Sequence, residues 1–444
     1  MERLPRKAAA KGSGEGPKAS TKKHGSGAAP LGIGILHYSC PPVVGGVEEI
    51  VSQQAHHFDR LGHSVSVLAG MGEVFSETFP VRIEPMLGSK DSQILQTMEE
   101  CKRGRQGALD GLTGTIYDIL KDWSGDLDVV LAHNVLHMPF NLPLTLALRR
   151  LADSAQGPVV VSWAHDSPHF QSSSPRYLEN PPWLVLQHPH RNIHYVTISE
   201  SRMKLFSQHC GDVPWKVIHN GIDPARFFYL EPKTVKLCQE LDLFSRDMVV
   251  VQPSRITPRK NLELSIHIIR GIKLLGYNVL FLLTGAYDPH EERALAYYRR
   301  LRYWINELEL QDNIAILAEY RFRDRKRLIP DRVFIRDLYL TADLLLMTSK
   351  DEGFGLPLLE AGMIKLPIAC TKIPPFTELG RGVCLFGLDE PPLCIAGRIM
   401  EYLGRTSTHK MFRNVMRHYV WDVICREEVM PFLRHVVRKG KEEG

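Results

Sequence analysis

The chain has 444 residues, of which 44% are hydrophobic and 24% charged, and its formal net charge is +5. This length exceeds one typical hydrophobic core and predicts two domains of roughly 200 residues each. The composition is typical of a globular enzyme, and the lack of an apolar run of about 18 residues argues against a membrane span.

Residues 1–30 are rich in Gly, Ala, Lys and Ser and predict a disordered basic tail. The tail holds seven Lys and Arg against two Glu, a balance of +5, so residues 31–444 are neutral overall. A neutral folded part gives little support to nucleic-acid binding. The tail lacks the apolar region of a signal peptide, and eight scattered cysteines without a CxxC pair favour reduced thiols. We therefore expect a cytoplasmic protein.

Short apolar runs alternate with helical patterns along the first half of the chain. A helix is predicted over 45–63, because apolar residues recur on one face before Gly62. Residues 86–126 predict some helix but no clear boundaries. The predicted strands are 31–38, 64–68, 128–133, 158–165 and 194–199. The stretch 215–223 ends this series at Asn220-Gly221, a strong turn signal.

A second alternation begins near residue 248. Its predicted strands are 248–254, 278–285, 313–320, 343–349 and 367–370, and its predicted helices lie near 260–275, 290–308, 333–340 and after Pro357. Such alternation predicts parallel sheets with helices on both faces. The fold class expected is α/β, with two doubly wound Rossmann-like domains (31–215 and 216–405) facing a cleft. A helical segment is predicted for 406–444.

The stretch DEGFGLPLLEAG places two glutamates around a glycine-rich turn. Glu352 follows a predicted strand, whereas Glu360 lies one turn inside the helix that Pro357 opens. Ligands of doubly wound sheets bind beyond the carboxyl ends of strands, so both glutamates are expected at the cleft. A sugar diphosphate suits this loop, since backbone N–H groups can bind oxygens and carboxylates can bind hydroxyls. The alternative is an ordinary capped surface helix.

Arg255 and Lys260 in PSRITPRKN follow the first strand of the second series. Arg binds phosphate oxygens through its planar fork, and Lys acts as a compact charge. Together they could stabilise a leaving diphosphate without a metal ion. Taken alone, such cations are more often solvated surface residues.

PSRITPRKN and YLTADLLLMTSKDEGFGLPLLEAG together resemble the donor-binding signature of retaining glycosyltransferases of family 4, which have the GT-B fold. The resemblance covers most of 31–405 and implies that 31–215 is the acceptor-side domain and 216–405 the nucleotide-sugar domain. It implies that Arg255 and Lys260 hold the diphosphate and Glu360 the ribose. Glu352 and the backbone of Gly353, Phe354, Gly355 and Leu356 would then hold the transferred sugar, with the base near residues 319–321.

Two features of the first half fit the same resemblance. Gly45 and Gly46 open the first helix, as in the glycine loop that the family places near the phosphates and acceptor. His165 ends a strand, where the family aims a histidine at the donor sugar; a histidine packed in a loop is the alternative. Lys365 and Ser254 stand where the family usually has glycine, and we expect both to alter backbone turns.

No metal cofactor is expected. Pro168 and Pro189 interrupt the spacing that the histidines between 165 and 194 would need to bind zinc. Asp126 and Asp128 form a nominal DxD motif that is better explained as the entry to a strand. The basic run 321–327 is interpreted as a solvated face, although it could meet an anionic acceptor or a membrane surface.

The function predicted is a hexosyltransferase that moves a sugar from a nucleoside diphosphate sugar to an acceptor hydroxyl with retention. The acceptor could be a small molecule, a polysaccharide or a lipid. Three alternatives stay open: a sugar-nucleotide hydrolase or epimerase of GT-B fold, a catalytically silent partner subunit that binds the sugar nucleotide, and a glycosidase with Glu352 and Glu360 as its carboxylates.

Overall fold

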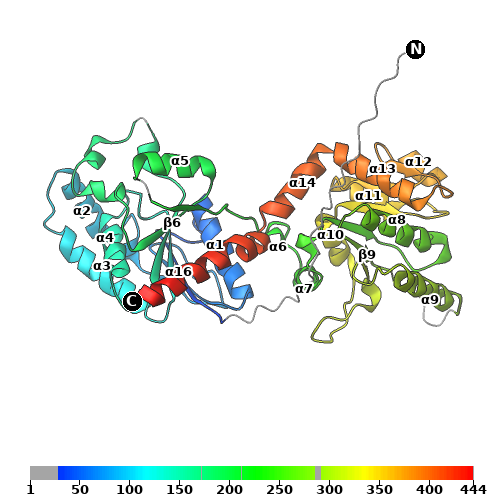
Figure 1. Cartoon of the computed structure of the whole chain (residues 1–444), viewed down its shortest axis with the longest axis horizontal. Helices are drawn as coiled ribbons and strands as arrows, with labels where there is room; N and C mark the ends of the chain where they lie inside the picture. The colour runs from blue at the N-terminus through cyan, green and yellow to red at the C-terminus, as the bar shows by residue number, and fades with distance from the viewer. Residues whose placement is uncertain (1–28, 172, 212, 286–291, 444) are drawn as a thin grey trace, which may run out of the picture.

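The chain forms two lobes that lie side by side along its longest axis (Figure 1). This computed structural model describes residues 29–171, 173–211, 213–285 and 292–443. Residues 1–28 of the predicted tail lie outside the described residues. Within the described part, no helix is long and apolar enough to span a membrane.

The first lobe is built on a parallel sheet of seven strands in the order β3-β2-β1-β4-β5-β6-β7. Its central strands consist almost wholly of buried residues, as two-sided burial requires. The strands are β1 Gly32–His37, β2 Ser64–Ala69, β3 Val81–Ile83, β4 Val129–His133, β5 Val159–Ala164, β6 Ile193–Thr197 and β7 Trp215–Val217. The helices are α1 Gly46–Arg60, α2 Ser92–Lys102, α3 Leu109–Trp123, α4 Leu142–Ala152 and α5 Glu200–His209.

The second lobe has a parallel sheet of six strands in the order β10-β9-β8-β11-β12-β13. The strands are β8 Met248–Gln252, β9 Val279–Leu283, β10 Ile314–Ile316, β11 Leu344–Met347, β12 Ile368–Thr371 and β13 Cys384–Phe386. The helices are α6 Pro224–Phe227, α7 Pro232–Glu240, α8 Leu262–Leu274, α9 Glu292–Glu307, α10 Arg332–Thr341, α11 Leu356–Met363, α12 Pro374–Leu379 and α13 Pro392–Arg405.

Both sheets are doubly wound, because the chain runs outward in one direction from β1 or β8 and then returns to continue on the other side. The predicted fold class is therefore confirmed. Two short edge strands, β3 and β13, were not predicted, since three residues are too few to give a pattern. Within 86–126 the structure contains α2 and α3, and α3 packs along α4.

The C-terminal segment crosses from the second lobe back to the first (Figure 1). The single terminal helix predicted near 407–440 is instead α14 Ser407–His418, α15 Trp421–Ile424, a π-helical turn Cys425–Val429 and α16 Met430–Glu443. Trp421, Val429 and Leu433 belong to the same buried cluster as Ile33 and Val51 of the first sheet and α1. This segment is thus part of the first lobe's core, which sequence periodicity alone could not indicate.

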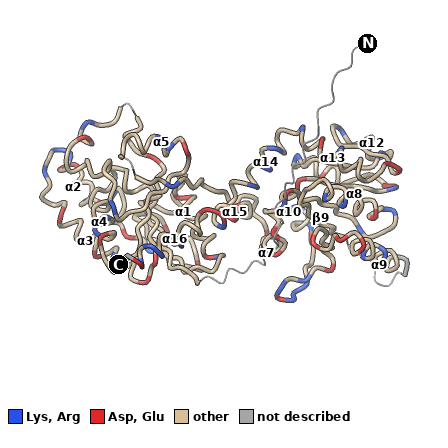
Figure 2. Tube along the Cα trace, viewed as in Figure 1, with Lys and Arg blue, Asp and Glu red and all other residues tan. Residues whose placement is uncertain are grey.

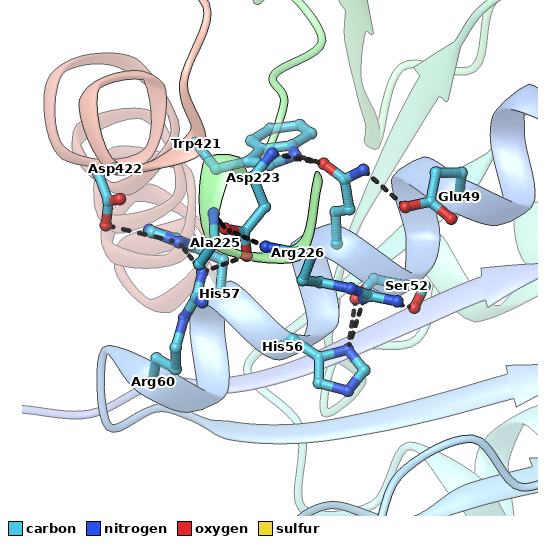
Figure 3. A network of polar contacts seen from close by, with 11 residues as sticks. Glu49, Ser52, His56, His57, Arg60, Asp223, Ala225, Arg226, Trp421 and Asp422 are labelled. Atoms are coloured by element: carbon cyan, nitrogen blue, oxygen red, sulfur yellow. Dashed lines mark hydrogen bonds and ion pairs between the residues drawn. The ribbon is translucent and has the colours of Figure 1, made fainter. Parts of the chain in front are cut away.

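Polar contacts tie both crossings of the chain to helix α1 (Figure 3). Gln53 of α1 accepts hydrogen bonds from Trp421 Nε1 (2.9 Å) and from the backbone N–H of Asp223 (3.0 Å). The Arg60 guanidinium pairs with the buried Asp223 carboxylate at 2.7 Å, and Arg226 donates to Ser52 Oγ at 2.8 Å. One face of α1 therefore holds the two segments that join the lobes.

All eight cysteines are unbonded, in agreement with the reduced thiols expected. Seven of them are buried, whereas Cys394 on α13 is exposed. Lys365, one of the two departures from the family pattern, has φ of 62° just after α11. A left-handed backbone explains why glycine is usual there, since a side chain adopts it at a cost.

Candidate active site

The glycine-rich turn after β11 is built as its sequence predicts. Gly355 is the N-cap of α11 with φ of 104°, a conformation that favours glycine, and Pro357 lies in the first turn. An added Cβ at Gly355 would also lie 3.1 Å from the Phe376 ring. Both constraints keep the backbone at 353–356 open at the carboxyl end of the sheet, where the Phe354 and Leu356 side chains are exposed.

The Glu352 carboxylate is paired with nearby cations. Its Oε1 pairs with Lys260 Nζ and accepts a hydrogen bond from Ser349 Oγ at 2.7 Å. Arg259 lies 3.6 Å from Oε2. The side chains of Glu352 and Lys260 are only 9% and 13% exposed, so this pair is well shielded from solvent. Lys260, predicted to bind the diphosphate, therefore also serves as the counter-ion of Glu352.

Glu360, on α11, has a different environment from Glu352, which lies in the loop before that helix. Its Oε2 accepts a hydrogen bond from the Tyr339 hydroxyl of α10 at 2.9 Å, while the rest of the residue is exposed. Burial, together with the Glu360 carboxylate, raises the pKa of Tyr339 well above its usual range, so the hydroxyl stays protonated and donates. Tyr339 was not predicted as a site residue; it orients Glu360.

A cavity of about 1330 Å³ opens at the carboxyl end of the second sheet. Among the described residues, its lining comes entirely from the second lobe and includes Arg255, Tyr339, Leu356 and Glu360. The volume is ample for a ligand larger than a typical drug molecule. The structure thus brings Arg255, Leu356 and Glu360 to one cavity, with the Lys260–Glu352 pair in the adjoining loops.

Among the described residues, Arg255 is one of four exposed arginines that line this cavity, together with Arg327, Arg332 and Arg336. It follows β8 directly, and no described residue forms a hydrogen bond or ion pair with its guanidinium. Gly285 at the end of β9 allows this loop to approach, because a Cβ there would lie 2.0 Å from the Ser254 carbonyl oxygen. The hydroxyl of Ser254, the second departure from the family pattern, is buried without a partner among the described residues.

The loop between β10 and α10 forms another wall of the cavity. It contains the basic run 321–327, whose Lys and Arg gather at its projecting tip (Figure 2). Arg327 donates to the Ala318 carbonyl at 3.0 Å, and both residues line the cavity. One end of the run, at Arg327, therefore forms part of the cavity wall, whereas residues 323–326 are exposed to solvent.

The predicted site residues of the first lobe lie apart from this cavity. Gly45 is the N-cap of α1, and a Cβ there would lie 2.1 Å from Glu48 Oε2, so the Glu48 side chain would have to move to admit one. Gly46 has open space beside it. Glu48 Oε1 accepts a hydrogen bond from Ser39 Oγ at 2.6 Å and lies 3.9 Å from His37 Nε2. The Glu48 carboxylate thus lies beside the glycine loop, in the first turn of α1.

His165 belongs to a row of three buried histidines that the sequence analysis missed. His37, His133 and His165 stand at the carboxyl ends of β1, β4 and β5, which are neighbours in the sheet. His37 Nδ1 donates to the His133 carbonyl at 2.6 Å, and His165 Nε2 lies 3.3 Å from His133 Nδ1. A histidine at the end of two predicted strands, and one position before the end of a third, was the signal available in the sequence.

Burial keeps this histidine row uncharged. Desolvation lowers the pKa of His165 to about 3, helped by the proximity of His37, and lowers the pKa values of His133 and His37 as well. Neutral imidazoles are hydrogen-bonding groups with one donor and one acceptor nitrogen. The row therefore offers polar contacts without net charge.

Among the described residues, no group of three or more His, Cys, Asp or Glu is placed so that it could hold a metal ion. Asp128 of the DxD motif accepts the Gly32 N–H at 2.8 Å and pairs with Lys441 at 2.9 Å. These are structural contacts at a strand entry. Independence of metal ions remains a prediction.

Two family models match the chain, one in each lobe. "Glycosyltransferase Family 4" matches residues 44–226, and "Glycosyl transferases group 1" matches residues 236–381. Together with the two doubly wound domains, these matches define a glycosyltransferase of the GT-B class. The chain belongs to the group 1 glycosyltransferases.

Curated relatives match only part of the chain. The serotype-specific mannosyltransferase WbdA of Escherichia coli is 39% identical over 71 residues, which are 16% of this chain and 9% of that protein. The mannosylglucosylglycerate synthase of Petrotoga mobilis is 22% identical over 276 residues, 57% of this chain and 61% of that protein. The chain thus spans under a tenth of the first relative and about three-fifths of the second.

Solved structures align over most of the chain at low similarity. Sucrose-phosphate synthase of Thermosynechococcus elongatus has a TM-score of 0.38 and 14% identity, covering 91% of this chain and 99% of that one. HepE of Anabaena, in complex with UDP and glucose, has a TM-score of 0.33 and 19% identity, covering 92% and 99%.

Proposed function

We propose that the chain transfers a hexosyl group from a nucleoside diphosphate sugar to an acceptor hydroxyl, with retention of configuration at the anomeric carbon. The observation that carries this proposal is the cavity that holds Arg255 and Glu360 together at the end of the second sheet. A guanidinium without a partner among the described residues suits a diphosphate, and a carboxylate that accepts a hydrogen bond from Tyr339 suits a ribose diol.

In the reaction proposed, the bond between the anomeric carbon and the diphosphate breaks, and the acceptor oxygen bonds to the same face of that carbon. The acceptor proton passes to an oxygen of the leaving diphosphate. Arg255 stabilises the negative charge that develops on this leaving group, with Lys260 beside it. Glu352 and the backbone of 353–356 position the transferred sugar. The proposed reaction requires no metal ion.

The first lobe would complete the site by approaching the second. Gly45, Gly46 and His165 lie at the carboxyl edge of its sheet, although they do not line the cavity. Closure of two domains around a substrate excludes water and assembles groups from both sides. We therefore assign His165 to the donor sugar and the glycine loop to the phosphates and acceptor in the closed enzyme.

Two of the relatives suggest which donor to try first. WbdA is named a mannosyltransferase and the Petrotoga mobilis protein a mannosylglucosylglycerate synthase, so a mannosyl donor is the first choice. The acceptor class stays open between a small molecule, a polysaccharide and a lipid.

The test is a thermal-shift screen of GDP-mannose, UDP-glucose and ADP-glucose, followed by acceptor trials with the best donor. We expect one donor to raise the melting temperature of the full chain, and Arg255→Ala to remove that shift. A glycoside product with retained configuration, seen by NMR, supports the proposal. Release of nucleoside diphosphate without a glycoside indicates a hydrolase, and binding without turnover across the acceptor panel indicates a silent partner subunit.

A further inference from the structure

The buried histidine row contains a continuous chain of hydrogen-bonding atoms that starts at helix α1. Gln54 is buried, and its Oε1 lies 3.0 Å from His133 Nε2. On the other edge of the same ring, His133 Nδ1 lies 3.3 Å from His165 Nε2. Three side chains from α1, β4 and the end of β5 are therefore linked in series.

The chemistry of these atoms assigns the protons. With the Gln54 amide oriented so that Oε1 faces His133, His133 Nε2 carries the proton that is donated to this oxygen, because a carbonyl oxygen only accepts. A neutral ring then has no proton on Nδ1, which must accept a hydrogen bond from His165 Nε2–H. A neutral His165 with its proton on Nε2 has an unprotonated Nδ1. Burial favours neutral imidazole over imidazolium, so each ring carries one proton and the orientation of the Gln54 amide sets the tautomers of the whole series.

We propose that Gln54, acting through His133, fixes His165 as the Nε2–H tautomer, so that His165 Nδ1 accepts a hydrogen bond from a hydroxyl of the donor sugar. Gln54 and His133 are positioning residues in this proposal. Its last step rests on the proposed function, whereas the tautomer itself does not.

Packing holds the two rings in this arrangement. His133 stacks on the buried Trp163 with planes at 20° and ring centroids 5.4 Å apart. Asn134 Oδ1 accepts the backbone N–H groups of His165 (3.1 Å) and Asp166 (2.9 Å). These contacts hold the His133 ring and the backbone at His165 in place, and the His165 side chain is itself buried.

The Nδ1 atom of His165 is the one left for a ligand. No described residue forms a hydrogen bond with it, and it is not one of the fully buried atoms without a partner. An acceptor nitrogen at this place favours a hydroxyl, which can donate, over a phosphate or carboxylate oxygen, which cannot. This preference would select the sugar part of the donor.

The alternative arrangement is a Gln54 amide turned by half a rotation. Its Nε2, which has no partner among the described residues, would then donate to His133 Nε2. The proton of His133 would move to Nδ1, and His165 Nε2 would become the acceptor. His165 would carry its proton on Nδ1 and offer a donor to the ligand, so the two arrangements predict opposite tautomers.

The experiment measures imidazole ¹⁵N chemical shifts in the full chain labelled with ¹⁵N-histidine, without any ligand. His165→Gln identifies the signals of His165. We expect a protonated Nε2 and an unprotonated Nδ1 at pH 7. In His133→Asn the amide oxygen replaces Nδ1 as the acceptor, so the His165 tautomer should be kept. In His133→Phe the acceptor is gone, and the signals should shift towards a mixture of tautomers.

A protonated His165 Nδ1 in the unmodified chain would overturn the proposal, and so would an unchanged tautomer in a folded His133→Phe variant. Once a donor is known, His133→Phe should lower kcat/KM by about three- to tenfold, the scale of one hydrogen bond, and His133→Asn should restore it. A correct tautomer with no donor in the screen would contradict the proposed function alone. A correct tautomer with unchanged kinetics would overturn the ligand contact.

Discussion

The two lobes place polar side chains at the same topological position, the carboxyl edge of a parallel sheet, but in opposite electrical states. In the first lobe His37, His133 and His165 are buried and neutral. In the second, Arg255 and Glu360 are exposed and charged at an open cavity. The comparison teaches that a shared topology fixes where ligands bind, while burial decides whether the contacts are ionic or neutral hydrogen bonds.

The largest expected difference between the lobes is in their stability at low pH, where the first lobe should be the less stable. Burial lowers the pKa of His165 and of His57 to about 3 and that of His137 to about 4. The unfolded chain therefore binds more protons below pH 6.5, and stability falls as the pH drops from about 6.5 towards these values. Each such histidine costs about 1.4 kcal/mol per pH unit. Calorimetry from pH 7.5 to 5 should show a falling melting temperature. Hydrogen exchange over the same range should show that the first lobe unfolds first.

His137→Phe is the matched test of this pH dependence, because it removes one buried histidine and should reduce the slope. His209→Asn changes an exposed histidine of α5 and should leave the slope unaltered. Equal slopes in all three proteins would contradict the assignment.

Removing Arg255 of the second lobe should have the next largest effect. Arg255→Ala is expected to lower turnover of the nucleoside diphosphate sugar about 10²- to 10³-fold, as for loss of one preorganised donor to a developing anion. Arg302→Ala, on the exposed side of α9, is the control. Full turnover by Arg255→Ala in a steady-state assay would show that the diphosphate binds elsewhere.

The two glutamates of the second lobe should separate binding from turnover. Glu360→Gln should weaken donor binding by about 1–3 kcal/mol, because its contact is similar in ground and transition states. Glu352→Gln should lower kcat about tenfold or more, because Glu352 is proposed to face the sugar where positive charge develops. Calorimetric Kd values and kcat measure both. Intact turnover in Glu352→Gln with none in Glu360→Gln would reverse the roles.

A substitution where the chain crosses between the lobes should have a smaller effect, on stability. A Cβ at Gly221 would lie 2.7 Å from the buried Trp421 ring, so Gly221→Ala should destabilise the chain by about 1–3 kcal/mol in urea unfolding. Gly397→Ala in α13 meets nothing within 4 Å and should be neutral or stabilising. Equal stability of both variants would mean that the crossing can relax.

The smallest expected effect is that of a chelator. Because Arg255 and Lys260 are proposed to take the place of a metal ion, EDTA should leave transfer unchanged in an assay of product formation. Loss of activity that Mg²⁺ or Mn²⁺ restores would contradict the role given to these cations.

Local pattern predicted most of what depends on neighbours in sequence. The strands, the helix that Pro357 opens and the doubly wound class follow from periodicity and turn residues that act over a few positions. The turn predicted a glycine at 355, and the φ of 104° at Gly355 is a left-handed conformation that favours glycine. Edge strand β13 escaped notice because three residues hold too little pattern.

Only the tertiary structure decided which distant residues meet. The ion pair of Lys260 with Glu352, the support of Glu360 by Tyr339 and the return of Trp421 to the first lobe join positions 92, 21 and 368 residues apart. The alternation of strands and helices by itself determined two Rossmann-like domains, and it predicted ligand sites at their carboxyl edges. The charge state of each edge came from burial, which depends on how the whole chain packs and is written in no single segment.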